Sequence, residues 1–337
     1  MAQTLSWKAL LAHALIGTVL FAAANVATYY SSQYFQRERG YQDEVSGFFD
    51  RPHATAVFAG DSHVAQLDNE LLADTAYNIA WGGDGLREVY AKLKYLAWRH
   101  AKIDTLYLTA DPHMFGTGRL ESSNRAFVNE YLLETGSRFG LEKGAASAAL
   151  GLIPLFNDDF VQYLKKKIAL SLKRTPPATV RDDEVAWQSL TDAQREAQAR
   201  STGEMDHAGI GRYREPFLWY ERIAALARAR GIHIVGVIYP SHEAYADSVS
   251  ERQYAQLRQF LSSIGIDEIV DFRHAFSDPS YFADPDHVSR KGAVALLRLI
   301  GRQTGRQLLA ADVDAPASIA ARAAPGGNEP PTSVRRQ

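Results

Sequence analysis

Apolar and polar residues follow one another along the chain in blocks that predict strands and helices in turn. Short runs of β-branched and aromatic residues predict strands, and longer stretches with apolar residues every three or four positions predict amphipathic helices. The predicted strands are residues 54–59, 76–80, 103–109, 232–239 and 268–272, and the predicted helices are residues 86–99, 217–230, 253–263 and 290–305. This alternation is typical of a three-layer α/β domain with a mostly parallel sheet.

A hydrophobic segment near the N-terminus differs from this pattern. Residues 9–28 carry no charge, and the segment is long enough to cross a hydrocarbon core of about 30 Å. Lys8 precedes it, and Trp7 and Tyr29 lie at its edges, where amphipathic rings prefer to be. We expect residues 1–30 to be an uncleaved signal anchor with a cytoplasmic N-terminus. Cleavage near the alanines at 22–24 and a buried soluble helix are the two alternatives.

Three further regions interrupt the alternation. Residues 31–50 are polar and aromatic and predict a stalk before an α/β domain at residues 51–309. A stretch from about residue 112 to 215 is too long for a loop and predicts a helical insertion. Its lysines at 165–167 indicate either a solvated helix face, which we prefer, or a basic amphipathic helix near anionic lipid or an acidic polymer. Residues 310–337 lack periodicity and predict a disordered tail.

Charge and composition narrow the class of function. The chain has 37 basic and 39 acidic residues and a net charge of −2, so no general attraction to nucleic acid is implied. It contains no cysteine, which excludes disulfides, thiolate catalysis and zinc bound by cysteine.

Two short motifs point to acyl-transfer chemistry. Gly60-Asp61-Ser62-His63 follows the first predicted strand, and Asp284-Pro285-Asp286-His287 precedes the last predicted helix. A serine hydroxyl is a poor nucleophile until a base accepts its proton. We therefore predict Ser62 as nucleophile, His287 as base and Asp284 as the carboxylate that orients the base. We expect Asp286 to point elsewhere and His63 to be a loop or pocket residue.

An acyl-transfer site also needs donors for the oxyanion of the tetrahedral intermediate. The backbone N–H of Ser62 is one candidate. A second is expected from the loop at residues 78–85, because its glycines let the backbone approach a substrate closely.

Three blocks of the sequence together resemble the SGNH/GDSL esterase superfamily. They are Gly60-Asp61-Ser62, the pattern Asn-x-x-x-x-Gly-Asp at residues 78–84, and Asp-x-x-His-x-x-x-x-Gly at residues 284–292. The resemblance covers about residues 54–111 and 217–305. It implies a flavodoxin-like α/β/α domain and Ser-His-Asp acyl transfer without cofactor or metal. It assigns Ser62 as nucleophile, Gly83 as oxyanion donor, and Asp284 and His287 as the activating pair.

One block departs from the pattern of this family. Its third block usually reads Gly-x-Asn-Asp, and the Asn completes the oxyanion hole. Residues 109–113 of this chain read Thr-Ala-Asp-Pro-His instead. We therefore expect Asp111 to orient a loop and His113 to donate to the oxyanion.

The anchor, the altered third block and the large insertion resemble the exported SGNH-like proteins of bacterial surface-polymer acylation, such as those of alginate O-acetylation and lipoteichoic-acid D-alanylation. That resemblance implies a single-pass protein of the bacterial inner membrane with a periplasmic catalytic domain. It also implies a multispanning membrane acyltransferase as partner and a polysaccharide substrate, acylated or deacylated through acyl-Ser62.

Two other classes of function stay open. One is a non-catalytic protein of this fold that binds a glycan or an assembly partner. The other is a metal-dependent hydrolase that uses Asp61, Asp111, His113, Asp286 and His287, although the chain has no helix-spaced pair of the His-x-x-x-His type.

Overall fold

A computed structural model of the chain describes residues 6–120, 122, 124–136, 153–172, 183–266 and 268–314. Its centre is a sheet of five strands in the order β2-β1-β3-β4-β5, and every pairing is parallel. The α/β class and the parallel sheet predicted from the sequence are therefore confirmed. The strands are β1 (Ala56–Ala59), β2 (Ala76–Asn78), β3 (Thr105–Thr109), β4 (His233–Ile238) and β5 (Glu268–Asp271).

The strand order has a reversal beside β1. From β1 the chain passes to β2 on one side and then returns to β3 on the other, with Val57 aligned to both Tyr77 and Leu106. At such a reversal the connections leave the sheet in opposite directions, which opens a crevice at the carboxyl ends of the strands. The segments that follow β1 and β3 therefore meet at this crevice.

Two hydrophobic clusters enclose the sheet. One contains side chains from α4 (Leu86–Trp98), α10 (Glu215–Ala229) and α12 (Glu251–Ser263), and the other contains side chains from α13 (Arg290–Thr304) and the segment after α3 (Ser62–Ala65). Both clusters include strand residues, because alternate side chains of a strand point to opposite faces. These helices lie within one to two residues of their predicted bounds.

The last helix begins and ends as its sequence predicts. Ser289 accepts a hydrogen bond from the N–H of Gly292 at 3.2 Å and so caps the helix start. Gly305 takes a left-handed conformation, with φ of 67°, and ends the helix. This start matters for function because the Asp284–His287 loop leads directly into it.

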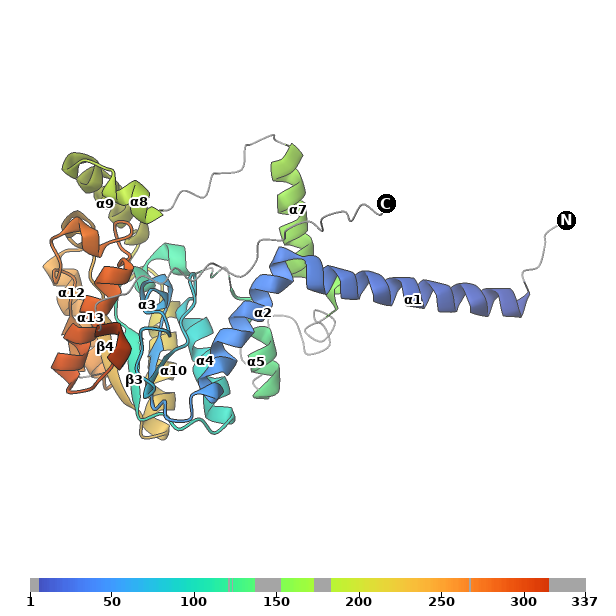
Figure 1. Cartoon of the computed structure of the whole chain (residues 1–337), viewed down its shortest axis with the longest axis horizontal. Helices are drawn as coiled ribbons and strands as arrows, with labels where there is room; N and C mark the ends of the chain where they lie inside the picture. The colour runs from blue at the N-terminus through green and yellow to red at the C-terminus, as the bar shows by residue number, and fades with distance from the viewer. Residues whose placement is uncertain are drawn as a thin grey trace, which may run out of the picture.

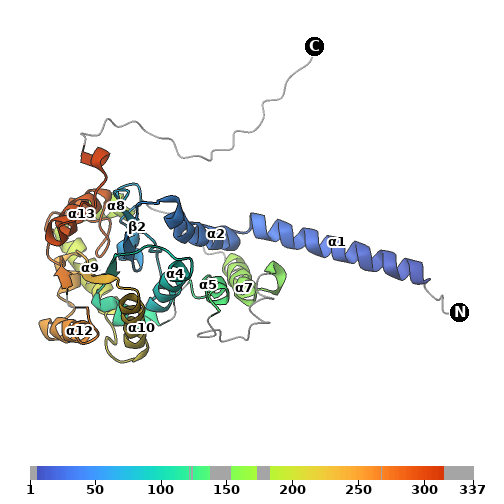
Figure 2. The ribbon, with the colours of Figure 1, turned by 90° about the horizontal axis from the view of Figure 1, so that it is seen from below.

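The N-terminal helix α1 (Trp7–Ser31) projects away from the rest of the protein (Figures 1 and 2). It is long and apolar enough to cross a membrane, and nearly all its side chains are exposed. A membrane-spanning segment is therefore compatible with the structure, whereas a buried soluble helix is not.

The residues expected to form a stalk belong to the folded body instead. They form α2 (Gln33–Ser46) and the 3-10 helix η1 (Gly47–Asp50). Tyr41, Val45 and Phe48 are buried in the hydrophobic cluster that also contains α4. The aromatic residues that we took as part of a spacer are thus the side chains that dock α2 against the domain.

The inserted region is helical where the structure describes it. Residues 137–152 and 173–182 lie outside the described residues, as does the predicted tail from residue 315 onward. The tail's first residues still pack on the domain, since Ala310 donates to the carbonyl of Leu71 at 2.9 Å. The remaining elements are η2 (Pro112–Phe115), η3 (Thr117–Arg119), α5 (Asn129–Glu134), η4 (Pro154–Phe156), α7 (Asp158–Leu172), α8 (Asp183–Gln188), α9 (Asp192–Asp206), α11 (Glu243–Ala246), η5 (Pro279–Tyr281) and η6 (Ala311–Asp314).

Candidate functional site

The serine motif lies at the carboxyl end of β1. Gly60 is required there, because a Cβ would lie 2.3 Å from Cγ2 of Val64 and 2.9 Å from Cβ of Thr109. Asp61 caps α3 by accepting a hydrogen bond from the N–H of His63 at 3.3 Å. Ser62 is the first residue of this short helix and is half-buried.

The histidine motif has the predicted contact between Asp284 and His287. Both carboxylate oxygens of Asp284 lie 2.9 Å from Nδ1 of His287. One of these oxygens also accepts the backbone N–H groups of Asp286, at 3.1 Å, and of His287, at 2.9 Å. This loop therefore fixes both the orientation of the imidazole and the nitrogen that carries the proton.

Folding brings the two motifs together across 223 residues of sequence. Nε2 of His63 lies 3.0 Å from a carboxylate oxygen of Asp286, and the rings of His63 and His287 lie 5.1 Å apart. No hydrogen bond joins Ser62 to Nε2 of His287, which is buried and has no partner among the described residues. The structure therefore places the serine and histidine motifs in one site without forming the nucleophile–base contact.

The glycine loop reaches the serine from β2. The N–H of Asp84 donates to the carbonyl of Trp81 at 3.0 Å, and Gly83 between them has φ of +84°. This is a type II turn, which needs glycine at that position. A Cβ on Gly82 would lie 3.9 Å from Cβ of Ser62. In the described part of the chain, neither Gly83 nor Ser62 uses its backbone N–H in a hydrogen bond.

Three side chains that our sequence analysis did not single out hold this loop. Ser122 donates to the carbonyl of Gly83 at 2.8 Å, and Asn124 donates to the carbonyl of Gly82 at 3.1 Å. The ammonium of buried Lys92 lies 2.7 Å from both the carboxylate of Asp84 and the carbonyl of Ile79.

These contacts engage the carbonyls of Ile79, Gly82 and Gly83 with donors of the protein itself. Lys92 lies at the border of the apolar face of α4, and the two donors come from the inserted region, so no periodic pattern marked them.

Asn78, the first residue of the Asn-x-x-x-x-Gly-Asp pattern, has a structural contact. Its side-chain amide donates to the carbonyls of Val64 and Leu67 at 2.8 Å each, and its oxygen accepts the N–H of Ala80 at 2.9 Å. It therefore ties the end of α3 to the start of the glycine loop. Through this contact the serine helix and the loop keep a fixed spacing.

A second set of His–Asp contacts lies beneath the site. His63, 4% exposed, has Nδ1 2.9 Å from Asp111 and Nε2 3.0 Å from Asp286. Burial lowers the pKa of His63, but hydrogen bonds to the two carboxylates outweigh burial and raise the pKa well above its usual value. His63 is thus an imidazolium between two carboxylates. We expected a loop or pocket residue at this position, and the structure makes it a buried crosslink.

Asp61 is the other buried carboxylate of this set. It lies 2.7 Å from Nε2 of His113 and 2.6 Å from the guanidinium of Arg119. Burial raises the pKa of Asp61, and the charges of His113 and Arg119 outweigh that effect and lower the pKa far below its usual value. Asp61 therefore stays ionised inside the protein.

Asp111 and His113, from the Thr-Ala-Asp-Pro-His segment at residues 109–113, have different contacts. Asp111 accepts hydrogen bonds from the N–H of Tyr239 at 2.8 Å and the hydroxyl of Thr109 at 3.1 Å, in addition to its contact with His63. It thus ties the segments after β3 and β4 together. His113 uses Nε2 for Asp61, so only its buried Nδ1 is left as a donor. A role for His113 at the oxyanion stays a prediction.

Asp286 does not point away from the site, contrary to our expectation. One of its carboxylate oxygens contacts His63, and the other lies 3.5 Å from Nδ1 of His287. Burial lowers the pKa of His287, and hydrogen bonds to Asp284 and Asp286 outweigh burial and raise it to about 9. The sequence argument failed here because adjacent residues in a tight loop can both face the same side.

Two overlapping groups of side chains have the composition of a cation site. The nearest ligand atoms lie within 4.8 Å of one another in Asp61, His63 and His113, and in His63, Asp286 and His287. A bound cation needs neutral imidazoles with free lone pairs. His63 instead spends both ring nitrogens on carboxylates, and the guanidinium beside Asp61 repels a cation. The donor set therefore fits internal ion pairs better than a metal.

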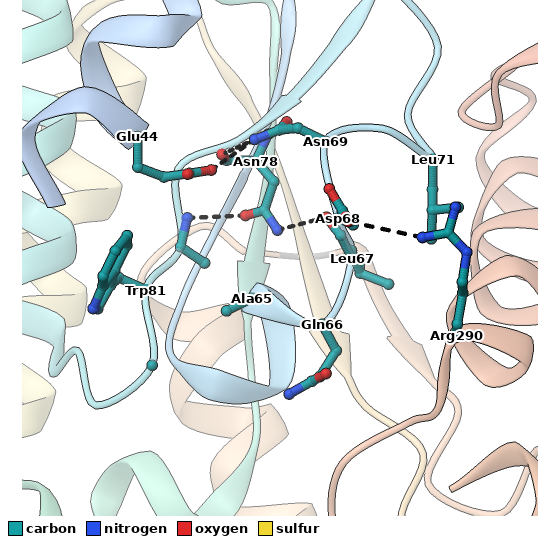
Figure 3. A pocket seen from close by; sticks show the side chains of 12 residues that line it. Glu44, Ala65, Gln66, Leu67, Asp68, Asn69, Leu71, Asn78, Trp81 and Arg290 are labelled. Carbon is teal, nitrogen blue, oxygen red and sulfur yellow. Dashed lines mark hydrogen bonds and ion pairs between the residues drawn. The ribbon is translucent and has the colours of Figure 1, made fainter. Parts of the chain in front are cut away.

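A pocket of about 380 Å³ adjoins the glycine loop (Figure 3). Trp81 and Glu44 lie on one side of it, and Asp68 and Arg290 lie on the other. Gly82, where an added Cβ would lie 3.9 Å from Cβ of Ser62, also lines the pocket, so the pocket and the serine both adjoin the glycine loop. An aromatic ring together with carboxylate, amide and guanidinium groups is a combination suited to a polar ligand with hydroxyl groups.

Searches for similar proteins identify no family. No protein-family model matches the chain, and no curated protein matches it significantly.

Proposed function

We propose that this protein is a membrane-anchored serine esterase or O-acyltransferase of the SGNH type. The carrying observation is the His287 imidazole, whose Nδ1 is held by Asp284 while its buried Nε2 has no partner among the described residues. In its neutral form, a ring held in this way has one nitrogen that can accept a proton. The strand order, which is that of flavodoxin-like domains, supports the proposed SGNH architecture with helices on both faces of the sheet.

The first half of the proposed reaction forms an acyl-enzyme. Neutral His287 takes the proton of the Ser62 hydroxyl at Nε2, and the serine oxygen bonds to the carbonyl carbon of the ester. The oxyanion then accepts hydrogen bonds from the N–H groups of Ser62 and Gly83, neither of which has another acceptor in the described chain. The bond to the leaving alcohol breaks, and that alcohol takes the proton from His287.

The second half differs only in the group that attacks. Water or a hydroxyl of the acceptor gives its proton to His287 and bonds to the acyl carbon, and Ser62 regains its proton as it leaves. The serine and Nε2 of His287 need to approach for both halves, and such contacts often tighten only when substrate binds. The rigid Asp284 contact and the fixed loop supply the rest of the geometry.

We propose a polysaccharide as the substrate on the basis of the pocket at the glycine loop. Its mix of Trp81, carboxylates and amides suits a sugar with several hydroxyl groups, and its volume of about 380 Å³ falls within the range of small-ligand sites. The proposed setting is the bacterial inner membrane, with the domain in the periplasm beside a multispanning membrane acyltransferase. The apolar α1 supports the anchor in this proposal.

Labelling with a fluorophosphonate probe tests the proposal directly. The full chain in detergent should be labelled, and Ser62→Ala should abolish labelling because the probe bonds only to an activated serine. Ser263→Ala is the matched control, since that exposed hydroxyl donates to the carbonyl of Phe260 on α12. Absence of labelling in the wild-type protein, with an intact fold, would leave the non-catalytic glycan-binding protein as the better function.

The alternative raised by the groups of possible metal ligands is a metal-dependent hydrolase, although their donor set fits internal ion pairs better. The same preparations decide between the two. Loss of ester hydrolysis on chelation, restored by added metal and retained in Ser62→Ala, assigns the chemistry to a cation. Activity that is insensitive to chelation and lost in Ser62→Ala assigns it to the serine.

A further inference from the structure

The inserted region contacts the apolar helix α1 within its uncharged segment. The N–H of Leu155, in η4, donates to the side-chain oxygen of Asn25 at 3.0 Å. The ring of Phe156 lies 5.5 Å from the ring of Phe21. Asn25 is the one buried residue of α1, because η4 covers it. The insertion therefore reaches α1 below its end, at a depth where a spanning helix lies in lipid.

The end of α1 supplies a depth marker. Tyr29 and Tyr30 stack with the guanidinium of Arg39, which lies 4.7 Å and 5.4 Å from the two ring centres. Aromatic rings and cations of this kind gather at the level of lipid headgroups. Asn25 and Phe21 precede Tyr29 by roughly one and two helical turns, or about 6 and about 12 Å at 1.5 Å per residue.

Two elements of the insertion, η4 and α7, expose apolar side chains. Leu155 and Phe156 on η4 are 41% and 53% exposed, and Leu164 and Ile168 on α7 are 44% and 53% exposed. Leu164 and Ile168 continue a row that begins with Phe160, which packs on Phe35 of α2 with ring centres 4.9 Å apart. We call these four exposed residues the η4–α7 face.

The orientation of α7 fits the plane of a bilayer. Figures 1 and 2 both place α7 at the domain end of α1, running across the direction of α1. A helix perpendicular to a spanning segment lies parallel to the membrane surface. Its exposed lysines at 165–167 add positive charge at the level where anionic headgroups would lie.

We propose that the η4–α7 face inserts into the outer part of the bilayer that α1 spans and holds the domain against the membrane. The contact with Asn25 supports this placement, because each partner would otherwise leave a polar group unsatisfied in hydrocarbon. In this proposal, the lysines at 165–167 belong to a basic amphipathic helix near anionic lipid, and not to the solvated helix face that we preferred from the sequence. The proposal depends on α1 spanning a membrane and is independent of the chemistry at Ser62.

The absence of cysteine allows a test with single labels in the full chain. Phe156→Cys and Ile168→Cys report the η4–α7 face, Leu20→Cys reports α1, and Met205→Cys, at a site 67% exposed on α9, is the aqueous control. Each variant carries an environment-sensitive nitrobenzoxadiazole label and is reconstituted in nanodiscs that contain anionic lipid and lipid with nitroxide on its acyl chains. Circular dichroism confirms that each variant folds.

Labels at 156 and 168 should be quenched at least about half as strongly as the label at 20, since interfacial helices lie about 5–10 Å deep. The label at 205 should stay unquenched. Quenching at 20 without quenching at 156 and 168 overturns the proposal and leaves the face for a membrane-protein partner. An unquenched label at 20 overturns it too, because α1 then does not span.

Discussion

The ring centres of His63 and His287 lie 5.1 Å apart, but the two rings differ in how many of their nitrogens contact carboxylates. His63 is 4% exposed and spends both ring nitrogens on carboxylates. The side chain of His287 is 19% exposed and spends one nitrogen, which leaves Nε2 without a partner in the described chain. The number of engaged nitrogens therefore separates a histidine that crosslinks elements from one that can move a proton.

The difference follows from what each histidine holds together. His63 joins the segments after β1 and β3 to the loop before α13, so it fastens three separate parts of the chain. His287 is held within its own loop by Asp284, three residues earlier. A base must change its protonation during each turnover. A ring locked between two carboxylates cannot do so without leaving them unpaired.

The largest expected effect comes from His287→Ala. Ester hydrolysis should fall by at least about 10³-fold, because loss of a catalytic base removes most of the advantage of a serine mechanism. Global stability should change little, since this side chain is held within its own loop and is partly exposed. The rate of p-nitrophenyl acetate hydrolysis and the thermal midpoint, measured on the same preparation, check the two parts. Unchanged hydrolysis would remove His287 from the mechanism.

A smaller effect, now on stability, is expected from His63→Ala. The change leaves Asp111 and Asp286 buried without their shared cation, and breaking a buried ion pair costs about 3–5 kcal/mol. Denaturant unfolding measures the loss. The raised pKa of His63 sets the pH dependence. The contribution of His63 to stability is full below the ordinary histidine pKa and is lost as pH rises through the raised value. Plots of unfolding free energy against pH for the wild type and His63→Ala should therefore converge at alkaline pH.

His207→Ala is the matched control for that change. His207 is also buried, but its Nδ1 contacts the hydroxyl of Ser248 at 2.6 Å, and burial lowers its pKa to about 3. A neutral histidine with a neutral partner should cost about 1–3 kcal/mol. If the two variants lose equal stability at neutral pH, His63 is an ordinary buried ring and the comparison with His287 fails.

The sequence predicted much of the fold because local patterns determine it. The strand at residues 232–239 is an uncharged β-branched run, and the helix at 290–305 has a serine cap and a terminal glycine. Residues 31–50 were predicted as a stalk, but they form α2 and η1 and pack against the domain. Tyr41 and Phe48 are spaced among charged residues, so the sequence does not show which side of the segment packs. Packing of α2 depends on partners far away in sequence.

The candidate site was predictable only where its contacts are local in sequence. Asp284 and His287 are three residues apart, so their contact is local and could be read from spacing. The buried network of His63 with Asp111 and Asp286 joins residues up to 223 positions apart, and only the sheet order brings them together. A serine motif followed by histidine carried no signal that this histidine would be charged and buried.

The pH dependence gives the finest test of how His287 differs from His63. A base must be neutral, and the carboxylates around His287 raise its pKa to about 9. Labelling of Ser62 by a fluorophosphonate should therefore rise about tenfold per pH unit and level off near pH 9. Asp286→Asn removes one of the two carboxylates and should shift the rise toward neutral pH. A wild-type profile with its midpoint near the ordinary histidine pKa would mean that neither carboxylate tunes the base.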